Sequence, residues 1–125
     1  MTMQWYEGPL AAFDTETTGV DVEGDRIVSA ALVVQDTAAA RPRVTRWLVN
    51  PGIPVPEGAT AVHGLTDNHL QRHGRWPAPV MEELARALAE QVAAGRPLVV
   101  MKAPFDLRIL ERELRTHRAS TLGDY

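Results

Sequence analysis

Residues 10–19 read Leu-Ala-Ala-Phe-Asp-Thr-Glu-Thr-Thr-Gly. The apolar run at residues 10–14 predicts a buried strand that emerges into a polar loop. Asp14 and Glu16 lie two residues apart at the end of that strand. Because side chains alternate along a strand, both carboxylates face one side while Thr15 faces the other. Two carboxylates on one face can bind a divalent cation such as Mg²⁺ or Mn²⁺, which prefers hard oxygen ligands.

The surroundings of this acid pair separate it from a chance pattern. From average composition, an Asp-x-Glu pattern occurs in about one chain in three of this length. A second copy, Asp21–Glu23, lies in a polar turn, and we interpret it as a solvated loop. The first pair instead follows an apolar strand and precedes Thr17, Thr18 and Gly19. Glycine there permits close backbone approach, and the exposed amides can face a phosphate or a sugar.

The remaining sequence predicts an α/β domain. The first three predicted strands have short connections and form an antiparallel meander. Residues 50–58 contain three prolines and two glycines, so they predict an extended loop. Helical periodicity follows, and Thr66 is a candidate cap. The predicted strands are residues 10–14, 26–35, 43–49 and 98–101, and the predicted helices are residues 66–72, 79–92 and 104–114.

A third carboxylate, Asp106, follows the strand at residues 98–101 and falls in the first turn of the last helix. If that strand lies beside the first strand and parallel to it, Asp106 converges with Asp14 and Glu16 at one edge of the sheet. The alternative is an ordinary acid at a helix start, where the helix dipole favours negative charge.

Three stretches resemble conserved motifs of the DEDD exonucleases, the DnaQ-like family of the proofreading epsilon-subunit type. Residues 13–19, Phe-Asp-Thr-Glu-Thr-Thr-Gly, resemble its first motif, and residues 62–66, Val-His-Gly-Leu-Thr, resemble the loop after its meander. Residues 98–106, which end in Ala-Pro-Phe-Asp, resemble its second motif. The stretches occur in the family's order and at about its spacing, so the resemblance covers nearly all of the chain.

The resemblance implies an RNase H-like α/β fold, in which a parallel strand and flanking helices join the meander. It also implies a 3′–5′ exonuclease that hydrolyses phosphodiester bonds at DNA or RNA 3′ ends, with two Mg²⁺ or Mn²⁺ ions in a complete site. The catalytic and metal-binding residues that it implies are Asp14, Glu16 and Asp106. The residues that it implies around the 3′-terminal nucleotide are Thr15, Thr17, Thr18, Gly19, His63 and Phe105. For His63, a loop-stabilising role is the alternative.

The chain departs from the family pattern in two places. Lys102 stands where the family usually has Asn, and it can either neutralise phosphate or compete with a metal for the carboxylates. The third motif, a His four residues before a final Asp, is missing, and we interpret the late candidates His117 and Asp124 as surface residues. We therefore interpret residues 1–125 as a single, C-terminally incomplete exonuclease domain, and we expect self-association through an uncovered sheet edge.

Composition narrows the function classes. The net charge of −3 argues against a DNA-coating module, which usually has a basic face. The chain has no cysteine, no signal-like start and no apolar run long enough to span a bilayer, so we expect a soluble cytoplasmic protein. The alternative to the exonuclease is a catalytically inactive nucleic-acid-binding or protein-interaction module with the same fold. A weaker third hypothesis is an acidic metal-binding domain that does not bind nucleic acid.

Overall fold

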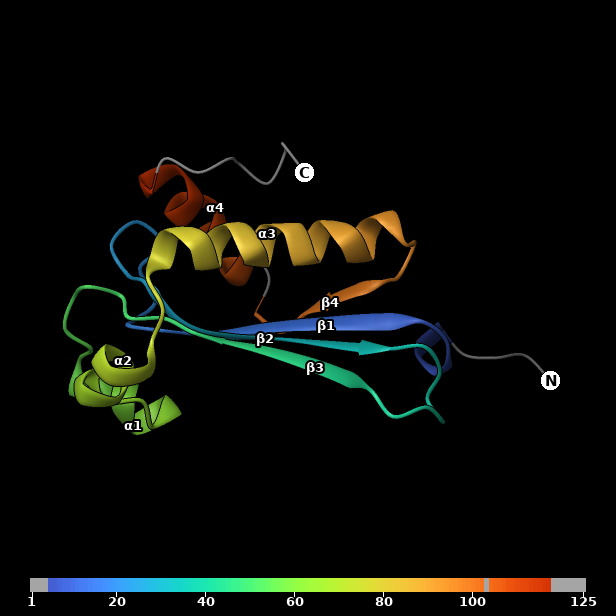
Figure 1. Cartoon of the computed structure of the whole chain (residues 1–125), viewed down its shortest axis with the longest axis horizontal. Coiled ribbons are helices and arrows are strands. Elements are labelled where there is room, and N and C mark those ends of the chain that lie inside the picture. The colour runs from blue at the N-terminus through green and yellow to red at the C-terminus, as the bar shows by residue number, and fades with distance from the viewer. Residues whose placement is uncertain (1–4, 103, 118–125) are drawn as a thin grey trace.

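A four-stranded mixed sheet forms the centre of the molecule (Figure 1). The computed structural model describes residues 5–102 and 104–117. β1, β2 and β3 form the predicted antiparallel meander, and β4 pairs with β1 in parallel, so both expectations are confirmed. The strand order is β3-β2-β1-β4. The bounds are Leu10–Thr17 for β1, Ile27–Gln35 for β2, Arg43–Leu48 for β3 and Leu98–Val100 for β4.

Strand β1 is longer than the sequence predicts. It continues past Asp14 to Thr17 because its backbone keeps pairing with β2 as far as Ile27. A register irregularity between Glu16 and Thr17 marks the point where the regular pairing ends. Asp14 and Glu16 are therefore held inside a paired strand and not at the edge of a loop.

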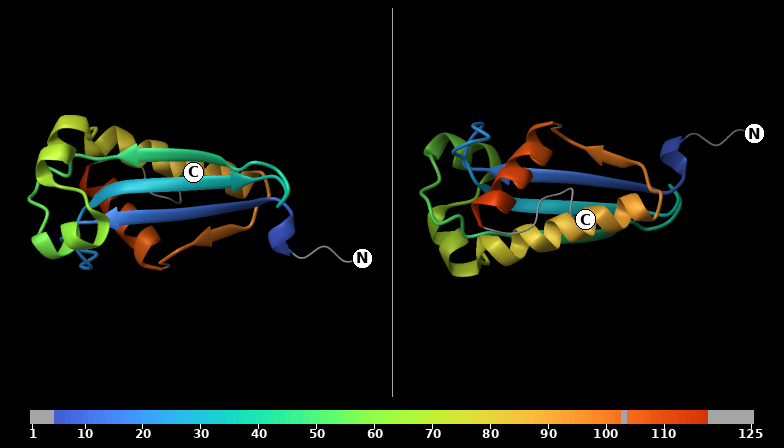
Figure 2. Two further views of the ribbon diagram at one scale, coloured as in Figure 1. Left: turned by 90° about the horizontal axis from the view of Figure 1, so that it is seen from below. Right: turned by 90° about the horizontal axis from the view of Figure 1, so that it is seen from above.

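The helices lie on one face of the sheet and at one end of it. Helices α3, Pro77–Ala93, and α4, Phe105–Thr116, cover one face, while α1, Glu57–His63, and α2, Asp67–His73, lie at the end where β1 terminates (Figures 1 and 2). A short 3-10 helix, Trp5–Glu7, precedes β1. Seen from below, the middle of the other face carries no helix among the described residues (Figure 2). None of the described helices combines the length and the apolar character that crossing a membrane requires.

The main core fills the space between the sheet and helices α3 and α4. Each large side chain buried there contributes roughly 1.5–3 kcal/mol to folding. Its buried members are Ala11, Phe13, Ile27, Ala30, Leu32, Val34, Trp47, Val49, Val80, Met81, Leu84, Ala85, Leu88, Ile109, Leu110 and Leu114. A smaller cluster of Val28, Val55 and Leu70 packs helices α1 and α2 against the end of the sheet. The apolar stripes predicted for the two long helices thus build the core.

Helix α1 is not predicted by the sequence. It contains Gly58 and buries none of its side chains, so it carries no apolar stripe. It ends at Gly64, whose φ of 76° is a left-handed conformation that favours glycine. Helix α2, in contrast, follows the expected cap, because Thr66 Oγ1 accepts a hydrogen bond from the His69 N–H at 3.2 Å.

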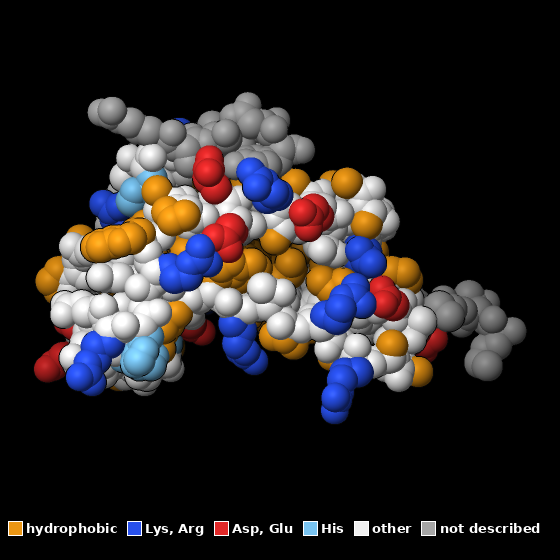
Figure 3. Space-filling model, viewed as in Figure 1, with side chains coloured by type: hydrophobic (Ala, Val, Ile, Leu, Met, Phe, Trp, Pro, Cys, Tyr) orange, Lys and Arg blue, Asp and Glu red, His pale blue; other side chains and the backbone are white. Residues whose placement is uncertain are grey.

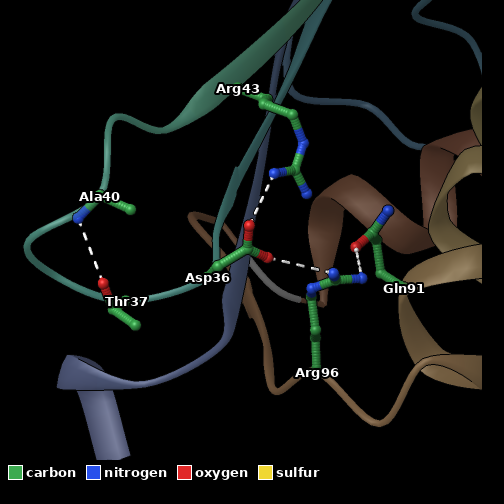
Figure 4. Close-up of polar contacts among 6 residues, drawn as sticks. All are labelled: Asp36, Thr37, Ala40, Arg43, Gln91 and Arg96. Atoms are coloured by element: carbon green, nitrogen blue, oxygen red, sulfur yellow. Dashed lines mark hydrogen bonds and ion pairs between the residues drawn. The ribbon is translucent and has the colours of Figure 1, made fainter.

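Asp36 joins the β2–β3 hairpin to the connection between α3 and β4 (Figure 4). Its carboxylate accepts hydrogen bonds from Arg43, at 2.8 Å, and from Arg96, at 3.3 Å. The hydrogen bond from Arg43 and then that from Arg96 lower the pKa of Asp36. Because the group is exposed to solvent, these ion pairs add little to stability. The two ion pairs hold the Arg43 and Arg96 side chains beside Asp36 and so connect the hairpin to the segment between α3 and β4.

Candidate active site

Asp14 and Glu16 lie on the sheet face that α3 and α4 leave open. Burial alternates along β1: Phe13 and Thr15, on the helix side, are 0% and 1% exposed, whereas the Asp14 side chain is 43% exposed. Both acids line a hollow of about 420 Å³ at the end of the sheet. The prediction that the two carboxylates share one face is therefore confirmed.

The far wall of this hollow comes from β2 and β3. Asp14 pairs with Ala31 on β2, and Ala31 pairs with Arg46 on β3, so the three residues form one row across the open face. The small side chains of Ser29 and Ala31 leave space between the acid pair and Arg46. Arg46 is exposed, and it forms no ion pair within the described part of the chain. The lining residues are Asp14, Thr15, Glu16, Ser29, Ala30, Ala31, Arg46, Trp47, Leu48, His63 and Leu65.

His63 lines the same hollow from the last turn of α1. The Leu65 N–H donates to its Nδ1 at 3.1 Å, so Nδ1 carries no proton. Nε2 then carries the proton and donates to the Thr17 carbonyl oxygen, 3.1 Å away. Both ring nitrogens are thus engaged in fixing the segment after α1 against the end of β1. This arrangement favours the loop-stabilising role, and only the face of the ring is left for a ligand.

The Lys102 side chain reaches the acid pair from the turn after β4. Its Nζ donates to the Thr15 carbonyl oxygen at 2.6 Å and lies 3.6 Å from Asp14 Oδ1. Asp14 Oδ1 is shielded from solvent and accepts no hydrogen bond from any described residue. The ammonium group is therefore the cation nearest to this oxygen among the described residues.

Asp106 lies close in space to the pair but on the other side of the strand. It is fully buried. Its Oδ1 accepts from the Thr15 hydroxyl at 2.6 Å, and its Oδ2 accepts from the Lys102 N–H at 3.0 Å. Because Thr15 faces the helices, Asp106 faces away from the hollow, and the described residues include no group of three potential metal ligands. The predicted position at the start of α4 is correct, but the three carboxylates do not meet in one cluster.

The loop after β1 is held by its own polar contacts. Thr18 is buried, and its hydroxyl donates to Asp25 Oδ1 at 2.8 Å. The Thr17 hydroxyl donates to the Gly19 carbonyl oxygen at 2.6 Å. A Cβ atom at Gly19 would come within 2.5 Å of Asp25 Oδ2, so a larger residue fits there only if the Asp25 carboxylate moves. The loop is thus shaped from within, and its backbone flanks the acid pair.

The structure brings together only part of the predicted nucleotide site. Thr15 and His63 border the hollow with Asp14 and Glu16, although the Thr15 hydroxyl itself lies on the helix side, against Asp106. Phe105 packs against the main core instead. The lining of the hollow also excludes Thr17, Thr18 and Gly19.

Sequence reasoning missed Arg46 and Ser29. The signal that could have found them is strand register, because alignment of the meander places every second residue of β2 and β3 on the face of Asp14. Strands β2 and β3 of the meander therefore contribute at least as many lining residues to the hollow as the motifs at residues 13–19 and 62–66 do.

Two side chains of helix α4 form hydrogen bonds to the β1–β2 loop and to the start of β2. Glu113 is fully buried, and its Oε2 accepts from the Ile27 N–H at 2.6 Å. Arg112 Nε donates to the Val22 carbonyl oxygen at 2.9 Å. Burial raises the pKa of the Glu113 carboxyl to about 6, although the Ile27 N–H and the Arg112 charge act in the opposite direction. The loop behind the acid pair thus depends on a buried ionisable group.

His117, one of the two late candidates for the third motif, is not among the residues that line the hollow. His117 is not the surface residue that we expected, because its side chain is only 20% exposed and Nε2 lies 3.5 Å from Glu113 Oε1. It follows the last residue of α4 and lies beside Glu113, and burial lowers its pKa. Asp124 lies outside the described residues.

Surface charge is mixed on the face shown in Figure 3. Lys and Arg side chains lie beside Asp and Glu side chains over α3, and no large patch of one sign covers this face. This agrees with the small net charge of −3. The face in Figure 3 therefore offers no broad basic surface to an anion such as phosphate.

Comparison with known sequences supports the motifs. Residues 11–122 match the RNase T exonuclease family. A DNA polymerase III subunit epsilon-like protein from Rhodobacter capsulatus is 41% identical over 106 residues, which are 83% of this chain and 14% of that protein. The DNA polymerase III subunit epsilon from Treponema pallidum is 31% identical over 105 residues, which are 84% of this chain and 46% of that subunit. The chain thus spans less than half the length of either relative.

Solved structures share the fold. Exonuclease I from Methylocaldum szegediense superposes with a TM-score of 0.71 at 20% identity, over 88% of this chain and 24% of that chain. A product-bound exonuclease I gives a TM-score of 0.74 at 14% identity, over 91% and 27% of the two chains. E. coli exonuclease I in complex with a dT13 oligonucleotide gives 0.69 at 15% identity, over 90% and 25%. These matches, together with the mixed sheet and its helices, show the RNase H-like α/β fold.

Proposed function

Because this chain belongs to the DnaQ-like exonuclease family, we propose that it hydrolyses phosphodiester bonds at the 3′ ends of nucleic-acid strands with divalent metal ions. One observation carries the proposal. Asp14 and Glu16 share one wall of an open hollow, and Asp14 Oδ1 there is shielded and accepts no hydrogen bond from the described residues. A buried carboxylate oxygen without a donor is a natural ligand for a cation.

The residues present fit a divalent ion at the acid pair. Asp14 and Glu16 supply the hard oxygen ligands that Mg²⁺ and Mn²⁺ prefer. When bound, such an ion lowers the pKa of a coordinated water and stabilises charge on the phosphate. The resemblance assigns Asp106 to a second ion in a complete site, and that role requires the Asp106 carboxylate to leave the Thr15 hydroxyl. In the present arrangement, Asp106 positions Thr15 and Lys102 around the pair.

The substrate strand would occupy the open face of the sheet. Arg46 would hold a phosphate across the hollow from Asp14, because guanidinium groups bind phosphate with two parallel hydrogen bonds. The small side chains of Ser29 and Ala31 leave room for a sugar or a base. His63 would keep the wall rigid, and its ring face would contact the terminal nucleotide. The loop residues Thr17, Thr18 and Gly19, together with Phe105, would support this wall.

Degradation of 5′-labelled single-stranded DNA and RNA tests the proposal. We expect ladders that shorten stepwise from the 3′ end, that require Mg²⁺ or Mn²⁺ and that disappear with Asp14→Asn. Arg46→Ser should raise KM by about 10-fold with little change in kcat, since it removes one phosphate contact of about 1–2 kcal/mol. Cleavage in EDTA, or an unchanged rate for Asp14→Asn, would contradict the metal assignment.

A catalytically inactive nucleic-acid-binding module is the second candidate. The observation in its favour is that the Lys102 ammonium already lies beside Asp14 while both Asp106 oxygens are engaged. In that case the chain binds the same oligonucleotides, Arg46→Ser weakens binding, and no product forms with any divalent ion. Binding and cleavage measured on one labelled strand separate the two functions.

The self-association expected from the sequence stays a prediction. Strand β4 pairs with β1 on one side, and no described strand lies on its other side. Sedimentation at micromolar concentration measures the assembly state. Val99→Lys adds a charge to this edge and should shift any assembly toward the monomer.

A further inference from the structure

Lys102 has an unusual place in both the sequence and the structure. It is the single lysine of the chain, which otherwise uses arginine for its basic side chains. Its backbone is fixed by Asp106, because its N–H donates to Asp106 Oδ2 at 3.0 Å and its carbonyl oxygen accepts from the Asp106 N–H at 3.1 Å. The side chain therefore starts from a defined point and reaches the acid pair.

The ammonium group contacts oxygens of the kind that a metal ion uses. It donates to the Thr15 carbonyl oxygen at 2.6 Å and lies 3.6 Å from the shielded Asp14 Oδ1. Carbonyl and carboxylate oxygens are the usual ligands of Mg²⁺ and Mn²⁺. The lysine ammonium is a compact point charge, whereas the arginine guanidinium is a wide planar group. Lysine therefore resembles a metal ion more closely in size and in the distribution of its charge.

The Asp106 carboxylate offers no free oxygen to a cation that sits beside Asp14. It is fully buried, and both of its oxygens accept hydrogen bonds, from the Thr15 hydroxyl and from the Lys102 N–H. We propose that the Lys102 ammonium takes the place of one of the two divalent ions of a complete site, so that this chain binds a single ion at Asp14 and Glu16. This inference rests on the proposed function and specifies its metal requirement.

The contacts of the Lys102 ammonium contribute little to stability, since its hydrogen bond to the Thr15 carbonyl oxygen is worth about 0.5–1.5 kcal/mol. The side chains of Lys102 and Asp14 are 45% and 43% exposed, and ion pairs with such exposure contribute about 0–1 kcal/mol. Replacing Lys102 should therefore lower the melting temperature only slightly and leave the protein folded. Metal stoichiometry can then be compared between variants that are equally folded.

Mn²⁺ titration of the full chain, by calorimetry and by the EPR signal of free Mn²⁺, tests the inference. We expect one ion per chain for the wild type, and two for Lys102→Met, which keeps the length of the side chain and removes its charge. The second ion would then take the Asp14 Oδ1 and Thr15 carbonyl oxygens that the ammonium vacates, while Asp106 stays in its buried place. Lys102→Arg keeps the charge and should still bind one ion. Two ions in the wild type, or one ion in Lys102→Met, would overturn the inference.

The absence of native cysteine allows a chemical rescue. Lys102→Cys can be alkylated with 2-bromoethylamine, in which the thiolate displaces bromide and forms a lysine-like side chain that carries an ammonium group. We expect two ions for the free thiol, two after neutral alkylation with iodoacetamide, and one after aminoethylation. Two ions after aminoethylation would refute the role of the charge. No ion in any of these proteins would instead refute the proposed function, so the two failures can be told apart.

Discussion

The pattern Asp-x-Glu occurs twice in neighbouring parts of this chain, as Asp14–Glu16 in strand β1 and as Asp21–Glu23 in the loop that follows. In the strand, both side chains face one hollow, and Asp14 Oδ1 accepts no hydrogen bond from the described residues. In the loop, Asp21 Oδ1 accepts from the Glu23 N–H at 3.0 Å, and both residues are exposed. The same residue pattern thus forms a candidate pair of metal ligands in the strand and a hydrogen-bonded turn in the loop.

The first test removes one charge from each pair. Asp14→Asn should lower Mn²⁺ affinity and any Mg²⁺-dependent cleavage by at least ~100-fold, because even groups that only orient a metal ligand are worth ~10–100-fold. Asp21→Asn, the matched control, should stay within about twofold because its carboxylate faces solvent. Calorimetric titration and cleavage of a labelled strand give the two numbers. Equal losses in both variants would show that the pairs do not differ in function.

The contrast between the two pairs is predictable from sequence because it depends on local structure. Side chains alternate along a strand, and the apolar run before Asp14 predicts a strand. The glycines and polar residues around Asp21–Glu23 instead predict a turn. The meander and the parallel β4 follow from similar patterns. Helix α1 does not, because a helix that buries none of its side chains has no apolar periodicity.

The contacts of Asp106 and Lys102 could not be predicted from the sequence. Their positions in the chain are clear, but the orientation of the Asp106 carboxylate depends on the Thr15 hydroxyl, which lies 91 positions away in sequence. The Lys102 side chain is long, and its end point is set by the Thr15 carbonyl oxygen and not by any local pattern. Arg46 joins the hollow through strand register across two ladders. Long-range pairing therefore decides the parts of the site that local patterns leave open.

The second test loosens the loop that separates the two pairs. Gly19→Ala places a Cβ atom against Asp25, whose carboxylate also accepts hydrogen bonds from the Thr18 hydroxyl and the Asp21 N–H. If Asp25 moves, both of these bonds are lost, so the free energy of unfolding should fall by about 2–3 kcal/mol.

Gly58→Ala is the matched control for this test. Apart from its chain neighbours and the backbone of its own helix, no atom lies within 4 Å of a Cβ at position 58. Because Gly58 is inside helix α1, the change should be neutral or should stabilise the protein by about 0.5–1 kcal/mol. Urea unfolding of both variants measures the difference. Similar values for the two variants would mean that Asp25 adjusts without cost.

The third test addresses the buried acid beneath the loop. The pKa of Glu113 is about 6 in the folded protein, against about 4.5 in the unfolded chain. Between these values the folded state keeps a proton that the unfolded state releases. Glu113 therefore favours folding at low pH and loses about 2 kcal/mol of that contribution as the pH rises through this window.

Glu113→Gln keeps an acceptor for the Ile27 N–H and removes the ionisation. Arg26 and Arg112 interact with the same carboxyl, and His117, whose pKa burial lowers, lies beside it and acts in the opposite sense by losing stability as the pH falls. The measurement is therefore the difference between the variant and the wild type in urea unfolding from pH 4 to pH 8. The variant should gain relative stability as the pH rises. A constant difference would mean that Glu113 does not titrate in this range.

The smallest effects should come from the loop pair itself, and they should be unequal. Asp21→Ala removes the acceptor of the Glu23 N–H and should cost about 0.5–1 kcal/mol, because that N–H can bond to water instead. Glu23→Ala removes an exposed side chain and should stay within about 0.5 kcal/mol of the wild type. At Asp14–Glu16, in contrast, loss of either acid should reduce Mn²⁺ binding, since both line the hollow. Asp21 and Glu23 variants that changed Mn²⁺ binding as strongly would place the metal in the loop and remove the distinction on which the assignment rests.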